Sequence, residues 1–536
     1  MAALRGCARK LCPARVGSVL LLASSLALGA TSAAAQEAGG ALPGKVTYDK
    51  WCTGCHGLEG KGDGAGAARM LPRPRDFTRA QYQIRNTGSG ELPTDADILH
   101  IIDVGMPGTA MPGWEDVLSD AEREQLVPYL KSLSRFFEGA PAPTVMEFTS
   151  TPSSSDERVA EGKQVYDQLQ CVKCHGVAGR ADGPSAPTLD DDTNSPIYPA
   201  NLEHNWEFNG GGEAEDVYRR LRTGLDGTPM PTFNDMLVAN QLTDDQLWSL
   251  ALYVRSLSPE KPPETREVIT ATLVTEGGLP TTPTDERWND VERFFVPMVG
   301  QIVVKPRWFD PRIKNLWVRA LHDGSEVALL VSWSDPSKSP DGKWGEFAQK
   351  IVATMEPRDE GSTWALGAHD QLVVQFPQTL PTGLERPYFL QGDARRPTYL
   401  WSWRGDQDRA VELVARGLGT GQEQDAPSQQ VSAVSSWADG EWLVLFRRSL
   451  ATADSAADLQ LPRATAIPVA FQAWDGDNGE AGNQAAVSTW YFLALEDATP
   501  ATVYVAPVLA FLLTAVLGIV VVSRAQKRER GQGSGA

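Results

Sequence analysis

The sequence predicts a multidomain fold: two all-α domains of one kind, then an antiparallel β-sandwich, then one C-terminal transmembrane helix. Three observations in the 536 residues predict this order. A Cys-x-x-Cys-His motif occurs twice, and each copy is followed 55 residues after its histidine by a Met-Pro pair. Short apolar runs separated by turn residues come next. The last apolar run, at residues 503–522, is uncharged and long enough to cross a bilayer.

The first 35 residues have the pattern of a secretory signal peptide. Cations precede an apolar stretch at residues 16–30, and alanines at 33–35 supply a small-residue cleavage site. An uncleaved anchor is the alternative, but the apolar stretch is short for a membrane span. Cleavage removes Cys7 and Cys12, so the four remaining cysteines all lie in the two repeated motifs.

The composition is acidic, with 49 Lys and Arg against 68 Asp and Glu and a net charge of −19. Four of the cations lie in residues 1–35, so the processed chain carries −23. This excess of negative charge disfavours nucleic acid as a partner. It suits docking to a basic redox protein, although the ordinary solubility of an exported surface explains it equally well.

The two helical domains, at residues 40–138 and 156–260, are an internal duplication joined by a Pro- and Ser-rich linker at 139–155. A shift of 119 residues superposes four positions of one copy on the same residue types of the other: Cys52 on Cys171, Cys55 on Cys174, His56 on His175 and Met111 on Met230. Each copy is expected to close with an amphipathic helix, N-capped by Ser119 or Thr243 and followed by acidic residues in the first turn.

The repeated motif predicts covalent haem attachment. Two thiols two residues apart can add to the vinyl groups of one haem, and the adjacent histidine then reaches the iron. A methionine from further along the chain closes the opposite axial position. A zinc site or a redox dithiol is the alternative, but a zinc site needs two further ligands nearby and a dithiol needs no adjacent histidine.

These features resemble class I cytochrome c domains. The resemblance implies two covalent haem c groups, attached through Cys52 and Cys55 in one copy and Cys171 and Cys174 in the other. It also implies the axial pairs His56 with Met111 and His175 with Met230. Met106 is a rival for the first iron, but its counterpart in the second copy is Leu225, so the repeat favours Met111. Because every axial position then has an occupant, His100 and His204 are expected in surface or loop positions.

Residues 265–497 read as the β-sandwich, and 12 of the 16 tryptophans lie from Trp288 onward. These are either core residues or the wall of a further cofactor site. Residues 290–495 resemble the ethylbenzene-dehydrogenase-like haem-binding domain, the γ-subunit fold of exported molybdenum oxidoreductases. The resemblance rests on short segments: Val318-Arg-Ala-Leu-His-Asp-Gly324, Ser332-Trp-Ser-Asp335, Gln375-Phe-Pro377, Gly392-Asp393, Trp401-Ser-Trp403, Ala473-Trp-Asp-Gly476 and Ser488-Thr-Trp490.

That resemblance implies a haem b in residues 265–497, held between an axial methionine and an axial lysine. In our alignment these two positions carry Gln391 and Gln484-Ala485, so the ligands are not the expected ones. A third haem therefore stays open on the sequence alone. Three other residues could serve as ligands only if the alignment is shifted, and otherwise have a structural role: Met298, Lys305 and His322.

The C-terminal span at 503–522 is followed by a basic tail at 523–536, which the positive-inside rule places in the cytoplasm. A buried core helix is the alternative. The sequence thus predicts a single-pass protein of the bacterial inner membrane with its haem domains on the periplasmic side. Its expected function is an electron relay, not an enzyme, with a redox partner such as a molybdenum oxidoreductase or a respiratory complex. The alternatives are a haem enzyme for a small inorganic substrate, and a ligand-binding or assembly protein with redox-reporting haems.

Overall fold

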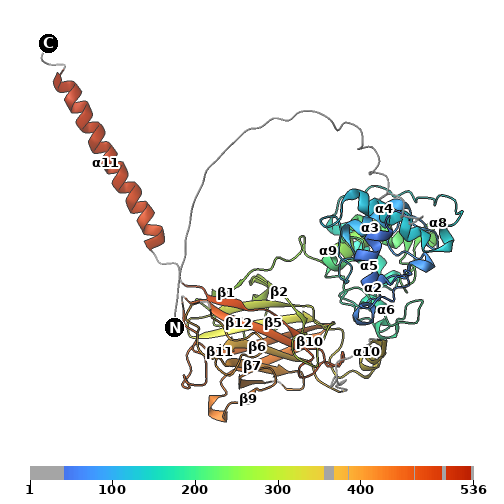
Figure 1. Cartoon of the computed structure of the whole chain (residues 1–536). Coiled ribbons are helices and arrows are strands. Elements are labelled where there is room, and N and C mark those ends of the chain that lie inside the picture. The colour runs from blue at the N-terminus through green and yellow to red at the C-terminus, as the bar shows by residue number, and fades with distance from the viewer. Residues whose placement is uncertain are drawn as a thin grey trace, which may run out of the picture.

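The computed structural model describes residues 42–354, 367–383, 385–407, 409–463, 465–497 and 502–532. The predicted signal peptide lies outside these residues. The described chain forms two small helical domains that lie together, a large β domain and one long C-terminal helix, as Figure 1 shows. The fold class expected from the sequence is confirmed in this order of elements.

The first helical domain packs its N-terminal helix against its closing helix. Its helices are α1 (Lys45–Trp51), α2 (Thr53–His56), α3 (Asp95–Val104) and α4 (Asp120–Ser132). At Gly44, a Cβ atom would lie 2.1 Å from the carbonyl oxygen of Gln125 on α4. Only glycine therefore allows the two helices to approach so closely.

The second helical domain repeats this arrangement. Its helices are α5 (Asp156–Gln168), α6 (Val172–His175), α7 (Ala214–Thr223), α8 (Asn234–Val238) and α9 (Asp244–Ser256). A Cβ at Gly162 would lie 2.0 Å from the carbonyl oxygen of Ser249, so α5 and α9 cross as closely as α1 and α4. The predicted cap of the closing helix is confirmed, because the Thr243 hydroxyl accepts from the Gln246 amide at 3.2 Å.

The β domain consists of two packed sheets that share β12 (Ile467–Trp474). One sheet runs in the order β10 (Ser432–Ala438), β11 (Glu441–Ser449), β5 (Glu326–Ser334), β4 (Asn315–His322), β1 (Val268–Leu273), β14 (Tyr491–Leu495), β12, with β2 (Phe294–Pro297) beside β4. The other runs β12, β6 (Gln371–Pro377), β7 (Thr398–Arg404), β8 (Ala410–Ala415), β9 (Gln422–Glu423), with β13 (Ala486–Val487) and β3 (Val299–Gly300) at its side. Pairing is antiparallel except at β1, which is parallel to both its neighbours. Parallel strands often read as continuous apolar runs, but β1 alternates buried and more exposed residues as antiparallel strands do, so its sequence did not show this exception.

Tryptophans fill the space between the two sheets. Trp333, Trp401, Trp403 and Trp442 are at most 1% exposed and belong to one apolar cluster. The rings of Trp403 and Trp442 meet edge to face with centroids 4.8 Å apart, a favourable aromatic geometry. These four side chains are therefore core residues.

One helix of the β domain, α10 (Gly342–Thr354), was not expected from the sequence. Its apolar face carries Trp344, Phe347 and Ile351, which pack against Ala186 and Tyr198 of the second helical domain. In Figure 1 the helix lies beside that domain. The helix thus buries apolar surface between two domains. The pattern of residues 342–354 alone does not show which domain covers this apolar face.

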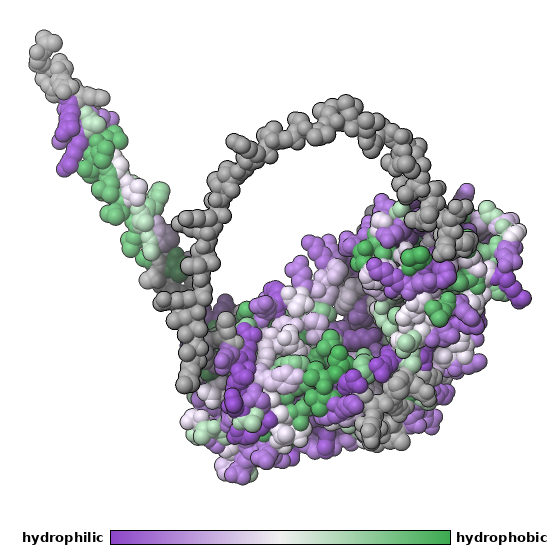
Figure 2. Space-filling model, in the orientation of Figure 1, coloured by the Kyte–Doolittle hydropathy of each residue, from purple (hydrophilic) through white to green (hydrophobic). Residues whose placement is uncertain are grey.

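The C-terminal helix, α11 (Thr502–Gln532), is longer than the predicted span. Within Val503–Arg528 the most apolar 18 consecutive residues have a mean hydropathy of 2.8, and none of these 18 residues is buried inside the structure. In Figure 2 an apolar surface covers the helix up to a hydrophilic end. By length and composition, this one helix can cross a membrane.

Candidate functional site

The two Cys-x-x-Cys-His motifs occupy the same local framework. Tyr48 donates its hydroxyl hydrogen to the carbonyl oxygen of Gly57 at 2.7 Å, and Tyr166 does the same to Gly176 at 2.7 Å. In each motif the histidine Nδ1 lies near a backbone carbonyl oxygen: Arg75 O is 3.0 Å from His56 and Ala200 O is 2.9 Å from His175. A bond from Nδ1–H to that carbonyl fixes the ring and leaves Nε2 as the metal-binding nitrogen.

Burial of the motifs favours neutral side chains. Desolvation lowers the pKa of His56 and of His175, which keeps the imidazole in the form that binds iron. Burial raises the pKa of Cys52 and of Cys171 to about 11. A redox dithiol needs the opposite, a thiol whose pKa is lowered toward neutrality. Burial thus does not activate the thiols of Cys52 and Cys171 in the way that a redox dithiol requires.

The two methionine loops share one set of hydrogen bonds. The Met111 amide donates to the Thr109 hydroxyl at 3.1 Å, and that hydroxyl donates to the Met106 carbonyl at 2.7 Å. In the second copy the Met230 amide donates to Thr228 at 3.2 Å, and Thr228 donates to Leu225 O at 2.8 Å. The repeated Gly-Thr-x-Met-Pro segment is therefore a fixed turn that presents equivalent methionines.

The predicted residues of the second site come together around one cavity. Cys171, Cys174, His175 and Met230 all line a space of about 660 Å³. Cofactor sites commonly measure roughly 300–1,000 Å³ and have mainly apolar walls, and Leu221, Phe233, Leu250 and Val254 supply such walls here. Two thiols, an imidazole and a thioether around an apolar cavity fit a covalent haem c with axial His and Met.

Three domains meet at this cavity. Gly108 and Thr109, from the methionine loop of the first copy, line it, and so do Arg312 and Lys314 of the β domain. The two helical domains are also joined by an ion pair of 2.8 Å between buried Arg85 and Asp226. The sequence assigned the second site to residues 156–260 alone, because contacts between domains have no sequence signature.

The two remaining histidines of the helical domains differ in position. His100 is exposed on α3. His204 lies in a loop, as expected, but is buried and lines the cavity. Its ring stacks on Trp206 with centroids 4.7 Å apart, and its Nδ1 lies 3.7 Å from a carboxylate oxygen of Glu207.

The expected haem b site of the β domain holds a glutamine network. Gln391 donates to Gln472 at 2.9 Å, and Gln472 donates to Gln375 at 3.3 Å. These side chains are at most 8% exposed, and Ala485 lies in the apolar cluster of Leu390 beside them. The two aligned positions thus carry buried glutamine and alanine side chains, and neither of these is a usual iron ligand. The residues present do not fit haem b.

The substitute ligands considered from the sequence are no better placed. Met298 is buried in the core between the sheets. His322 is fully buried and its Nε2 bonds to the Glu496 carbonyl at 2.8 Å. Lys305 lies in the segment after β3, where its carbonyl accepts from Asn483 at 3.0 Å. Met298 and His322 are therefore structural.

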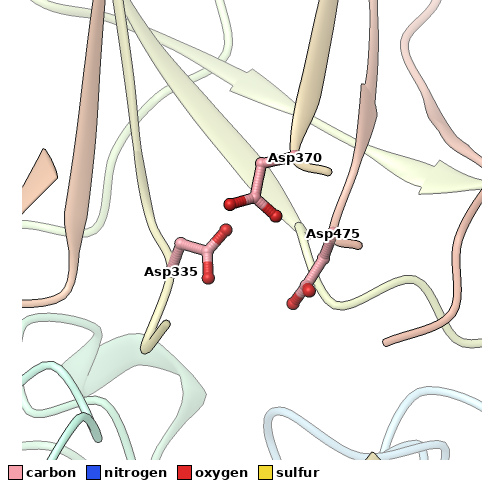
Figure 3. A group of neighbouring side chains, drawn as sticks. All are labelled: Asp335, Asp370 and Asp475. Atoms are coloured by element: carbon pink, nitrogen blue, oxygen red, sulfur yellow. The ribbon is translucent and has the colours of Figure 1, made fainter. Parts of the chain in front are cut away.

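A cluster of buried carboxylates was missed by the sequence analysis. Asp335, Asp370 and Asp475 point toward one another, as Figure 3 shows, with oxygen atoms within 4.8 Å. Such spacing suits a single cation, but N–H groups already bond to these oxygens. Asp370, for example, accepts from the Trp442 indole at 2.9 Å. Burial raises the pKa of all three groups, and their mutual repulsion adds to the shift for Asp335 and Asp475.

This crowding predicts a stabilising substitution. Asp475→Asn removes one charge and keeps the oxygen that accepts from the Asn478 amide at 3.0 Å. A carboxyl with a raised pKa destabilises the fold once pH exceeds its unfolded value near 4. The variant is therefore expected to gain stability on the order of 1 kcal/mol at pH 8, and less at pH 5. Thermal unfolding followed by tryptophan fluorescence measures this difference.

His322 also makes stability depend on pH, because burial lowers its pKa and the fold loses stability as pH falls below about 6.5. This effect is the same in variant and parent, so the difference between them reports Asp475 alone. Asp393→Asn is the matched control. Backbone N–H groups lower the pKa of Asp393, so its substitution should not stabilise the domain. A gain for Asp475→Asn that is larger at pH 5 than at pH 8 contradicts the prediction.

Three family models match the chain. Residues 40–130 match the model for cytochrome c oxidase, cbb3-type, subunit III, and residues 159–258 match cytochrome c. Residues 285–430 and 422–486 match ethylbenzene dehydrogenase. With the repeated motifs, the first two matches define residues 40–130 and 159–258 as cytochrome c domains.

More particularly, the chain contains two cytochrome c domains and an ethylbenzene-dehydrogenase-like domain, as the sequence predicted. The chlorate reductase subunit gamma of Ideonella dechloratans is 32% identical over 131 residues, 23% of this chain and 49% of that protein. The FixP subunit of the cbb3-type cytochrome c oxidase of Sinorhizobium medicae (strain WSM419) is 30% identical over 129 residues, 22% of this chain and 37% of that protein. The chain thus spans half or less of the length of these relatives.

Among the solved structures that match is one with a related sequence. It belongs to the reducing HAO-like protein complex of Kuenenia stuttgartiensis and is 43% identical in sequence. The match covers 41% of this chain and 97% of that chain, with a TM-score of 0.39. The cytochrome c domains support a role in electron transfer, and α11 supports attachment to a membrane.

Proposed function

We propose that the protein is an exported, membrane-anchored dihaem cytochrome that relays electrons and makes or breaks no substrate bond. In this proposal Cys52, Cys55, Cys171 and Cys174 attach two haems, and the iron ligands are His56 with Met111 and His175 with Met230. Haem iron supplies one-electron chemistry when bound. The protein fixes the ligands, excludes water and sets the separation of the two sites.

The contact between the first methionine loop and the second cavity carries this proposal. Thr109, whose hydroxyl holds the Met111 amide, also lines the cavity of Cys171 and His175. A ligand loop of one site thus forms part of the wall of the other. This proximity supports electron transfer between the two sites within one chain, without a mobile carrier.

The partner is proposed to be a periplasmic oxidoreductase, such as a molybdenum enzyme, or a respiratory complex. The relative in Ideonella dechloratans is a subunit of chlorate reductase, and the relative in Sinorhizobium medicae is a subunit of a cbb3-type oxidase. The acidic composition suits a basic docking surface on that partner. The basic residues after the span support a periplasmic position for the haem domains, because positive charge next to a span favours the cytoplasmic side for the tail.

A haem enzyme acting on a small inorganic substrate is the competing proposal, because that chemistry needs an open axial site. Carbon monoxide distinguishes the two. The reduced protein, purified from native membranes in mild detergent, is expected to contain two covalent haem c groups and no acid-extractable haem b. It is expected to bind no carbon monoxide rapidly, since both sixth positions are closed by methionine.

Rapid stoichiometric binding of carbon monoxide would favour the enzyme, and extractable haem b would overturn the haem-free assignment of the β domain. The same preparation tests the partner. Co-purification of oxidoreductase subunits supports a subunit role. If no co-purified protein exchanges electrons with the haems, a ligand-binding or assembly role is supported instead.

A further inference from the structure

The two cytochrome c domains differ in the segment that holds the histidine. The carbonyl that bonds His56 belongs to Arg75, and the carbonyl that bonds His175 belongs to Ala200. Two residues later, the amides of Phe77 and Leu202 donate to equivalent glycines, at 2.7 Å and 2.6 Å. The segments are therefore in register, and Arg73 and Arg75 of the first copy correspond to Tyr198 and Ala200 of the second.

The second copy thus lacks two arginines beside its histidine. This matters because haem carries two propionate carboxylates, and a carboxylate near a protein interior needs a cation or several N–H donors. Arginine is well suited, since its planar guanidinium can bind a carboxylate through two parallel hydrogen bonds. The first copy has this residue type in its own chain segment, at Arg73 and Arg75.

The β domain places an arginine where the second copy has none. The guanidinium carbon of Arg312 lies 3.7 Å from the centre of the Tyr198 ring, a close cation–π contact. Arg312 also lines the cavity of Cys171, His175 and Met230. Its backbone amide donates to the buried carboxylate of Glu480 at 2.9 Å, which fixes the segment.

Arg312 keeps its hydrogen-bonding capacity. The other guanidinium groups of the cavity wall are engaged: Arg180 pairs with Glu203 and Glu441, and Arg220 donates to the Asn209 and Gly211 carbonyls. Within the described part of the chain, no ion pair joins Arg312 to a carboxylate. Lys314, two residues on, adds an exposed second cation at the same wall.

We infer that Arg312 of the β domain binds a propionate of the second haem and so completes a cofactor site that the cytochrome c domain only partly builds. This inference rests on the proposed haem at Cys171, Cys174 and His175. A cation at the propionate stabilises the reduced, more negative state of the haem and raises its potential. The β domain is thus a structural part of the second redox site.

Potentiometric titration of the full-length protein tests the inference. Arg312→Gln is expected to shift the midpoint potential of the second haem to a lower value and to leave the first haem unchanged. Met230→Ala identifies which step belongs to the second haem. Arg312→Lys, which keeps the charge, should show a smaller shift, and Arg395→Gln, on the exposed surface of the same domain, should show none.

A rescue variant separates charge from packing. Tyr198→Arg gives the second copy the residue type found at Arg73, and is expected to restore the potential lost in Arg312→Gln. An unchanged potential in Arg312→Gln, or an equal shift of both haems, would overturn the inference. If Arg312→Gln does not accumulate in the cell, Arg312→Met removes the same positive charge, and the midpoint potential of the second haem is measured in that variant instead. A count below two covalent haems in the parent protein instead contradicts the haem assignment itself.

Discussion

Substituting Met111 by alanine is expected to abolish the thioether-to-iron absorption band of the first haem, whereas Met106→Ala should leave it intact. The Met111 amide is fixed by Thr109, and Met230 is held in the same way by Thr228. Met106 has no methionine counterpart, since Leu225 stands at its place. Loss of the thioether should also lower the potential of that haem within the range of about 0.8 V that axial ligands span.

The band of the whole protein makes the assignment quantitative. Met111→Ala and Met230→Ala should each remove about half of it, because the proposal gives each site one methionine ligand. The double variant should lack it. Each single variant should also bind carbon monoxide at the opened iron. Loss of the band in Met106→Ala, with retention in Met111→Ala, would reverse the assignment.

Ending the chain after residue 497 is expected to move the protein from the membrane fraction to the soluble periplasmic fraction, with both haems retained. The reason is that α11 carries the long apolar stretch at Val503–Arg528, none of which is buried against the other domains. The full-length protein should stay in membranes washed with high salt and be released only by detergent. Fractionation followed by haem staining measures the distribution.

A shorter truncation is the control. Removing residues 529–536 leaves the apolar stretch intact, so that variant should remain in the membrane. If the chain ending at 497 also stays in salt-washed membranes, then the globular domains hold it there and α11 is not the only attachment. A salt-sensitive association would point to a docked partner, because salt screens surface charge pairs.

The sequence determined what depends on local spacing. The two Cys-x-x-Cys-His motifs, the register of the duplication and the predicted choice of Met111 over Met106 all follow from residues a fixed distance apart. The closing helices followed in the same way, from a cap such as Thr243 and an apolar face repeating every three to four residues. The membrane span needed only the length and hydropathy of one segment.

The tertiary structure decided what depends on contacts between distant segments. Asp335, Asp370 and Asp475 are far apart along the chain, and only strand pairing brings their carboxylates together. In the same way, the contacts of α10 and of Arg312 with Tyr198 form only where the β domain packs against the second helical domain. The parallel pairing of β1 also needed the fold, since direction is a relation between strands. Local patterns carry the chemistry of each motif, whereas packing of distant segments decides which residues share a site.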